Sequence, residues 1–275
     1  MNIKLHVFEL GSMRMDANLV AAMSRVATAD NEKCPNELIE FPVPAFLIES
    51  DYGYVLYDTG CNPDCMGVDG RWPLEFQNRV PFQGDETTTV MYKLKELGIS
   101  PKDIKTVILS HMHNDHAGCV EYFPEAKFIV HKDEFQAAIH AYATHDYMSS
   151  YIWKDMDSWI RTKMNWNFIE KDEGNYRIFP GLTILNLGPG HARGILALKI
   201  DLKNTGTVIL TSDAVYCGIN YENDIEPGVI FDTAGWRRST RYLKKVAEES
   251  NAKVWYGHDR SQFDQLVKSP QGYYD

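Results

Sequence analysis

Short apolar segments recur along the chain, and each is bounded by glycine, proline, aspartate or asparagine. They are about 5 to 8 residues long and rich in β-branched side chains, which is typical of β-strands. The pattern predicts strands at residues 3–10, 44–50, 52–60, 105–110, 127–131, 182–188, 197–202, 207–213 and 253–258.

Helical patterns lie between these segments. In the stretch TTVMYKLKELG (88–98), apolar residues recur at intervals of three and four, and Gly98 stands where a helix C-cap is expected. Similar patterns occupy 133–143 and 238–251. Because strands and helices interleave in both halves, the sequence predicts an α/β fold (α+β in some schemes) with layered sheets. No repeat or low-complexity linker divides the chain, so we expect a single domain spanning residues 1–275.

The region 131–170 interrupts this alternation. It is rich in Tyr, Trp, Met and His, and its apolar positions alternate too little for a strand. We predict a helical, aromatic-rich insert at 131–170, in which a pair of helices covers the core. Alternatively, some of its aromatic side chains wall an apolar substrate pocket.

Composition narrows the possible functions. The chain has 275 residues, 44% of them hydrophobic, and a formal net charge of −10. Proteins that bind phosphate backbones need a basic surface, so we expect no nucleic-acid partner. No apolar run approaches the ~18 residues of a membrane span, and the first residues make no apolar signal core. We therefore expect a soluble cytoplasmic protein with no membrane partner.

The five cysteines are an odd number in a long chain, which does not suggest a disulfide framework. Cys61 and Cys65 form the stretch CNPDC, where a metal-binding or redox pair is one interpretation. Their spacing is one residue longer than the usual CxxC, and Pro63 indicates a turn. We predict a structural or incidental role for both.

The stretch SHMHNDHAG (110–118) carries the main chemical signal. In an extended segment, residues i, i+2 and i+4 share a face, which predicts that His111, His113 and Asp115 point the same way. His116 can turn in where the chain bends into a helix predicted at 117–123. Four ligands on one short loop do not enclose a single tetrahedral ion comfortably, and they suit two neighbouring ions.

Further candidate ligands follow other predicted strands. His191, Asp213 and His258 each stand at or just beyond a strand end, as His111 does. Ligand sites form at the carboxyl ends of strands in open α/β sheets, so these side chains are expected to converge. Five imidazoles and two carboxylates suit Zn²⁺, our first choice, and also fit Mn²⁺, Fe²⁺ or Co²⁺. The sequence thus predicts two divalent metal ions per chain.

The motifs HMHNDHAG, LYDTG (56–60), GPGH (188–191), SDAVY (212–216) and YGH (256–258) resemble those of the metallo-β-lactamase superfamily, in the same order. The resemblance implies an αββα sandwich, two mixed β-sheets packed face to face with helices on the outer faces. It implies that Asp213 bridges two metals and that Asp58 orients a ligand imidazole, the alternative being that Asp58 is a turn residue before Gly60. The remaining implied ligands are His111, His113 and His191 for one metal, and Asp115, His116 and His258 for the other.

Within the superfamily, HxHxDH combined with SDAxY and the long region before LYDTG resembles the N-acyl-homoserine lactonases, the quorum-quenching branch. This resemblance implies a hydrolase that opens the lactone ring by attack of a metal-bridging hydroxide. Tyr216 would then stabilise the oxyanion, unless it is only a packing residue, and Asp115 would carry the proton to the leaving oxygen. Alternatives are a glyoxalase II-like thioesterase, another lactone or ester hydrolase and, further away, a mono-iron dioxygenase.

The expected substrate is a small lactone with an apolar acyl tail, and the enzyme is expected to be a monomer or homodimer. Candidates for the acyl pocket are Met13, Met15, Phe135, Tyr147 and Trp153, each of which could instead be plain core packing. Asn114, a spacer in the ligand motif, is expected at the rim of this pocket. The other histidines are predicted to be core or surface residues; they are His6, His131, His140 and His145.

Overall fold

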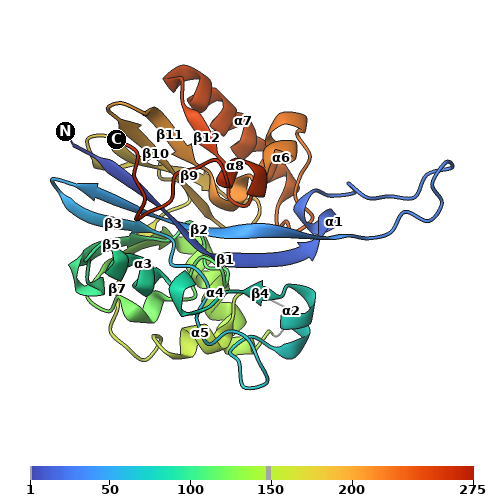
Figure 1. Ribbon diagram of the computed structural model, residues 1–275, viewed down its shortest axis with the longest axis horizontal. Helices are drawn as coiled ribbons and strands as arrows, with labels where there is room; N and C mark the ends of the chain where they lie inside the picture. The colour runs from blue at the N-terminus through green and yellow to red at the C-terminus, as the bar shows by residue number, and fades with distance from the viewer. Residues whose placement is uncertain (1, 147–149) are drawn as a thin grey trace.

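Two mixed β-sheets form the centre of the computed structural model, which describes residues 2–146 and 150–275 (Figure 1). The first sheet has seven strands in the order β4-β1-β2-β3-β5-β6-β7, and the second has five in the order β12-β11-β10-β9-β8. The first sheet comprises β1 (Lys4–Asp16), β2 (Leu38–Ser50), β3 (Gly53–Tyr57), β4 (Phe82–Gln83), β5 (Ile104–Ile108), β6 (Lys127–His131) and β7 (Asn165–Ile169). The second comprises β8 (Tyr176–Phe179), β9 (Leu182–Gly188), β10 (Ile195–Leu202), β11 (Gly206–Leu210) and β12 (Lys253–Trp255).

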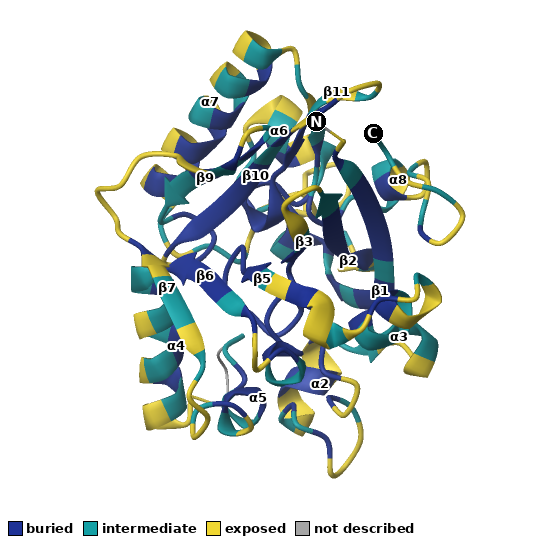
Figure 2. Cartoon of the chain, turned by 90° about the vertical axis from the view of Figure 1, so that its left-hand side faces the viewer, coloured by how far each residue is buried: buried dark blue, intermediate teal, exposed yellow. Residues whose placement is uncertain are grey.

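Helices cover the outer faces of both sheets (Figure 2). The helices α3 (Val90–Glu96), α4 (Lys132–Thr144) and α5 (Trp153–Asp157) lie on the side of the first sheet, and α7 (Thr233–Ser250) lies on the second. The shorter helices are α1 (Ala17–Val20), α2 (Leu74–Arg79), α6 (Gly218–Asn223) and α8 (Arg260–Phe263). Among the residues described, no helix is both long and apolar enough to cross a lipid bilayer.

Both faces of the central strands are buried, which explains their nearly continuous apolar sequences. In β5, Val107 packs under the outer helices, whereas its neighbour Ile108 enters the core between the two sheets. Leu198 and Leu210 supply the opposite side of that inter-sheet core. Successive side chains in a strand point to opposite faces, so burial on both faces requires consecutive apolar residues. The arrangement is the αββα sandwich, and the predicted fold class is confirmed.

Each strand expected from the sequence is present, but three strands were missed. They are β4, β7 and β8, which lie at sheet edges. The prediction of a purely helical region at 131–170 is wrong at its end, because Asn165–Ile169 pairs in parallel with β6 as β7. The helix predicted at 117–123 is also wrong, since only a 3₁₀ turn forms at Val120–Tyr122.

Candidate metal centre

The ends of four strands from both sheets bring the seven predicted ligands together. The segments that follow β5, β9, β11 and β12 carry His111, His191, Asp213 and His258 respectively. All seven side chains are buried, and none is more than 8% exposed. They form two groups in which the candidate ligand atoms lie within 4.8 Å of one another: His111, His113, His191 and Asp213 in the first, and Asp115, His116 and His258 in the second.

Asp213 lies between the two groups. Its Oδ2 is 3.3 Å from His191 Nε2 and 3.7 Å from His111 Nε2. Its Oδ1 is 2.9 Å from His258 Nε2 and 3.2 Å from His116 Nε2. Each oxygen of one carboxylate therefore faces a different set of imidazoles, which is the geometry that a bridging ligand requires.

The ligand loop is not extended throughout, and the expected alternation holds only for His111 and His113. The chain turns after His113, whose carbonyl oxygen accepts hydrogen bonds from the backbone N–H groups of His116 and Ala117 at 3.1 and 2.9 Å. The turn moves Asp115 into the second group, where its Oδ2 lies 3.4 Å from His116 Nε2 and 3.5 Å from His258 Nε2. The prediction that Asp115 shares the face of His111 and His113 is wrong for this reason.

The donor atoms fit divalent metal ions. Three buried atoms that face the centre have no hydrogen-bond partner within the described chain: His111 Nε2, His116 Nε2 and Asp213 Oδ1. Burying such atoms without a partner is costly, and a metal ion satisfies them. Burial also lowers the pKa of His113 to about 3, so this imidazole is neutral at physiological pH, as a metal ligand must be.

The outer ring nitrogens of the ligands are held by neighbouring groups. His191 Nδ1 lies 2.8 Å from the carbonyl oxygen of Val229, and His258 Nδ1 lies 2.8 Å from that of Pro42. Carbonyl oxygens only accept, so each Nδ1 carries the proton and each Nε2 presents its lone pair to the centre.

Asp58 contacts both His116 and the start of the ligand loop. Its Oδ2 lies 2.8 Å from His116 Nδ1, and its carboxylate accepts hydrogen bonds from Ser110 N at 2.7 Å and Ser110 Oγ at 2.8 Å. Asp58 has a φ of +62°, a left-handed conformation that is uncommon for residues other than glycine. These contacts are those of a residue that positions a ligand, and the left-handed φ also fits the alternative of a turn aspartate.

Glu134, on α4, was missed by the sequence analysis. Its Oε1 accepts a hydrogen bond from Met112 N at 3.0 Å, between two ligands of the first group. Its Oε2 accepts from Arg193 N, Gly194 N and Tyr151 Oη at 2.9, 3.2 and 3.0 Å. Glu134 is completely buried, and burial raises its pKa to about 7 against the lowering effect of these bonds. Glu134, Ala138 and Ala141 are spaced i, i+4 and i+7, so they lie on the same buried face of α4. An acidic residue on that otherwise apolar face was the sequence feature that could have identified Glu134.

A narrow pocket adjoins both ligand groups. It has a volume of about 50 Å³, and its wall includes Asn114, Tyr216 and the apolar side chains of Met13, Met15, Leu19, Phe76, Val80 and Val229. Tyr216 is buried, and its hydroxyl lies 3.3 Å from His191 Nδ1. Burial raises the pKa of Tyr216 well above its usual value, so the phenol keeps its proton and can donate it in a hydrogen bond.

Two of the predicted pocket residues, Met13 and Met15, line this pocket. Phe135 instead packs against Trp166 and Phe168, and Trp153 stacks on His145. Neither lines the narrow pocket, and their observed contacts match the alternative of plain packing. Tyr147 lies outside the described residues.

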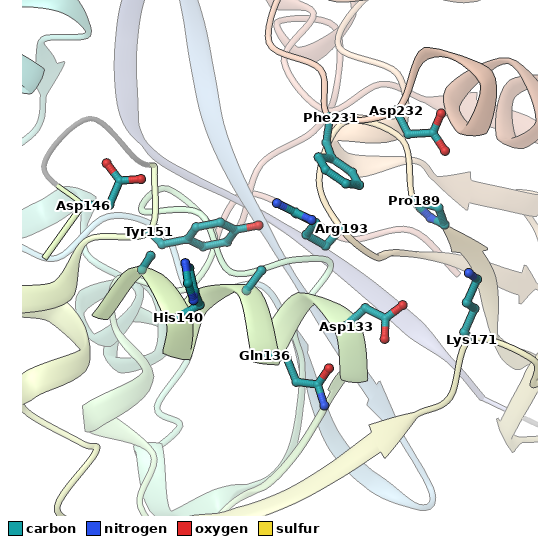
Figure 3. Close-up of a pocket in the computed structure, with 12 residues that line it drawn as sticks. Asp133, Gln136, His140, Asp146, Tyr151, Lys171, Pro189, Arg193, Phe231 and Asp232 are labelled. Atoms are coloured by element: carbon teal, nitrogen blue, oxygen red, sulfur yellow. The ribbon is translucent and has the colours of Figure 1, made fainter. Parts of the chain in front are cut away.

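A larger cavity of about 690 Å³ lies between α4 and the segments that carry Pro189, Arg193 and Phe231 (Figure 3). Its wall includes Arg193, whose guanidinium lies 3.8 Å above the ring of Phe231, and the charged residues Asp133, Lys171 and Asp232. None of the seven candidate ligands lines it. The narrow pocket, which contacts Asp115, Asp213 and His258 directly, is therefore the candidate reaction site.

The two cysteines of the CNPDC stretch and the four other histidines are not part of the two ligand groups. Cys61 and Cys65 are unpaired and buried in the apolar core, and burial raises the pKa of Cys65 to about 12. A thiol with such a pKa is a poor metal ligand or nucleophile. Neither metal-binding group among the described residues includes the other four histidines, which are His6, His131, His140 and His145.

An αββα sandwich with paired His/Asp groups at one edge defines a class of metal-dependent proteins, and the chain belongs to the metallo-beta-lactamase superfamily, whose profile matches residues 38–258. It is 43% identical over 276 residues to the N-acyl homoserine lactonase AiiB of Agrobacterium fabrum (strain C58), with 100% of both chains covered. It is 42% identical, again over all of both chains, to the N-acyl homoserine lactonase AiiB of Rhizobium rhizogenes (strain K84).

Solved structures show the same similarity. An N-acyl homoserine lactone hydrolase with the product N-hexanoyl-L-homoserine bound at its catalytic metal centre superposes with a TM-score of 0.82. It is 28% identical, and 100% of each chain is covered.

Replacing Asp58 by asparagine tests its positioning role. Asparagine keeps the shape and tolerates a left-handed φ, but it loses the carboxylate that binds His116 Nδ1. We expect the affinity for the second metal to fall by about 10-fold to 100-fold, measured by competition with a chromophoric chelator. Asp224→Asn is the matched control, because Asp224 is exposed and also has a positive φ of 57°. Equal affinities in the two variants would contradict the role.

Replacing Glu134 by glutamine tests the link between the two ligand loops. Both oxygens of Glu134 accept hydrogen bonds from backbone N–H groups, and glutamine replaces one of these oxygens by an NH₂ group that cannot accept. Because a buried donor would then face another donor, we expect the free energy of unfolding to fall by about 1 to 3 kcal/mol. Urea unfolding of the metal-free protein measures it. Glu170→Gln is the control, since Glu170 is exposed and bonds Lys132. A stability loss no larger than that of the control would show that these bonds contribute nothing.

Proposed function

We propose that the protein is a dinuclear-metal hydrolase that opens the lactone ring of N-acyl homoserine lactones, and so acts in quorum quenching. The observation that carries the proposal is Asp213, whose two oxygens face two separate imidazole groups beside a pocket containing the Tyr216 hydroxyl. Full-length relatives named N-acyl homoserine lactonase, at 43% and 42% identity, support this choice among the superfamily's reactions.

The residues present would hold two divalent ions, for which zinc is our first choice because the donors are imidazole nitrogens and carboxylate oxygens. Such ions, when bound, lower the pKa of water and polarise a carbonyl oxygen. The side chains that would hold the first are His111, His113 and His191, those for the second are Asp115, His116 and His258, and Asp213 would contact both.

Tyr216 and Asp115 supply the remaining chemistry. The protonated hydroxyl of Tyr216 donates a hydrogen bond to the lactone carbonyl oxygen as negative charge develops there. Asp115 lines the narrow pocket, and its Oδ2 lies 3.5 Å from His258 Nε2. From this position it can accept a proton from the attacking water and deliver it to the leaving ring oxygen, which becomes the hydroxyl of the product.

The pocket suits a small polar ring with an apolar tail. Its floor carries the ligands, whereas Met13, Met15 and Phe76 make part of an apolar wall. We propose that this wall binds the start of the acyl chain. A monomeric or homodimeric state and a cytoplasmic location stay predictions.

A hydrolysis panel at neutral pH tests the activity. It contains N-acyl homoserine lactones of several tail lengths, a simple γ-lactone, a glutathione thioester, a β-lactam and a phosphodiester. We expect ring opening of the acyl homoserine lactones to be the fastest of these reactions. A glutathione thioester cleaved faster than every lactone would replace this proposal with a thioesterase.

The role of Tyr216 is tested by Tyr216→Phe, which removes only the hydroxyl. Because this donor acts on charge that develops in the transition state, we expect kcat for lactone hydrolysis to fall by about 10-fold to 1000-fold. Tyr221→Phe is the control, since Tyr221 does not line the pocket. An unchanged kcat in Tyr216→Phe would reduce Tyr216 to a packing residue.

A further inference from the structure

Behind the ligand loop lies a second set of buried polar atoms without partners in the described chain. They are Asn114 Nδ2, both carboxyl oxygens of Asp155 and Arg71 Nη1, and Trp72 Nε1 also lies beside the Asp155 carboxyl. Arg71 Nη1 lies 3.8 Å from Asp155 Oδ1, too far for a direct hydrogen bond. Buried donors and acceptors without close partners are the groups that an ordered internal water satisfies in proteins.

A small cavity separates Asn114 from Asp155. Its volume is about 10 Å³, and Asn114, Asp155 and Met156 contribute to its wall. A cavity of about 10 to 15 Å³ accommodates one water. Burial raises the pKa of Asp155 to about 8, but the carboxyl keeps acceptor lone pairs in either protonation state.

Asn114 also lines the narrow pocket beside the ligands. It stands between His113 and Asp115, and its backbone N–H donates to the carbonyl oxygen of Ser150 at 3.0 Å, so its position is fixed. The residue is 4% exposed. It is the one carboxamide among the described residues that line this pocket. When the side-chain amide of Asn114 turns Nδ2 towards Asp155, its Oδ1 faces the narrow pocket beside the ligands.

We propose that Asn114 Oδ1 accepts a hydrogen bond from the N–H of the substrate's acylamino group, and that Asp155, through one buried water, holds Asn114 in that orientation. In an N-acyl homoserine lactone this nitrogen is attached to the carbon next to the lactone carbonyl, so its N–H lies close to the reacting bond. Asn114 is then a specificity-determining residue and Asp155 a positioning residue. The inference rests on the proposed lactonase function.

The test compares two lactones. One is N-hexanoyl homoserine lactone, and the other is a γ-butyrolactone with an alkyl chain of matched length on the same carbon and no amide. Asn114→Leu should lower kcat/KM for the amide substrate by about 10-fold to 100-fold, mainly through KM, because the bond forms in the bound substrate as well as the transition state. The loss on the amide-free lactone should be clearly smaller, so that the ratio of kcat/KM for the two substrates falls. Equal losses on both substrates, or no loss on either, would overturn the role of Asn114.

Asp155 is tested with the same pair of substrates. Asp155→Leu should lower the preference for the amide substrate, whereas Asp155→Asn, which keeps one acceptor oxygen, should restore most of it. Met156→Leu is the matched control, because Met156 lines the same cavity with no hydrogen-bonding N–H or O–H group. A preference unchanged in Asp155→Leu would overturn the positioning role.

A high-resolution structure of the metal-loaded wild-type protein tests the same link without depending on whether any variant folds. A water within hydrogen-bond distance of both Asn114 and Asp155 supports the link, and the absence of such a water overturns it. Failure of the proposed function is seen separately, because the wild-type enzyme would then hydrolyse neither lactone.

Discussion

The arrangement of the site depends on one carboxylate with two different sets of neighbours. Asp213 turns Oδ2 to the imidazoles of the first group and Oδ1 to those of the second. Five imidazoles and two carboxylates in so small a buried volume leave several polar atoms without protein partners. Burial of unsatisfied polar groups is unfavourable, so cations between the ligands would stabilise the site, as do the outer contacts that hold each ring.

The two sheets are joined directly beneath this site, which fixes the ligands of one relative to those of the other. Ser212 Oγ donates to Ser110 Oγ at 2.8 Å, and Leu196 N donates to Ser110 O at 2.9 Å. Tyr57 Oη donates to the carbonyl oxygen of Leu196 at 2.7 Å. Asp58 and Ser212 both have positive φ angles, of 62° and 46°. Backbone strain of this kind persists only where the surrounding contacts over-determine it, and it concentrates at functional sites.

Much of this could be predicted from local sequence. Strands such as β5 and β10 are buried on both faces, so their apolar runs are unambiguous, and the seven ligands follow strand ends at distinctive spacings. The edge strands β4, β7 and β8 were missed because they are short or partly exposed and carry a weaker apolar signal. Glu134 and Asp155 were missed for another reason, since their partners lie far away in sequence and only tertiary packing brings them together.

In the proposed mechanism, two metal ions held by the two ligand groups act together on a lactone. The most direct measurement removes metal with a chelator and then follows ring opening of an N-acyl homoserine lactone as Zn²⁺ is added back in known amounts. Activity should stay low through the first equivalent per chain and reach its maximum at the second. Full activity at one equivalent, or activity that persists in the metal-free chain, would contradict the account.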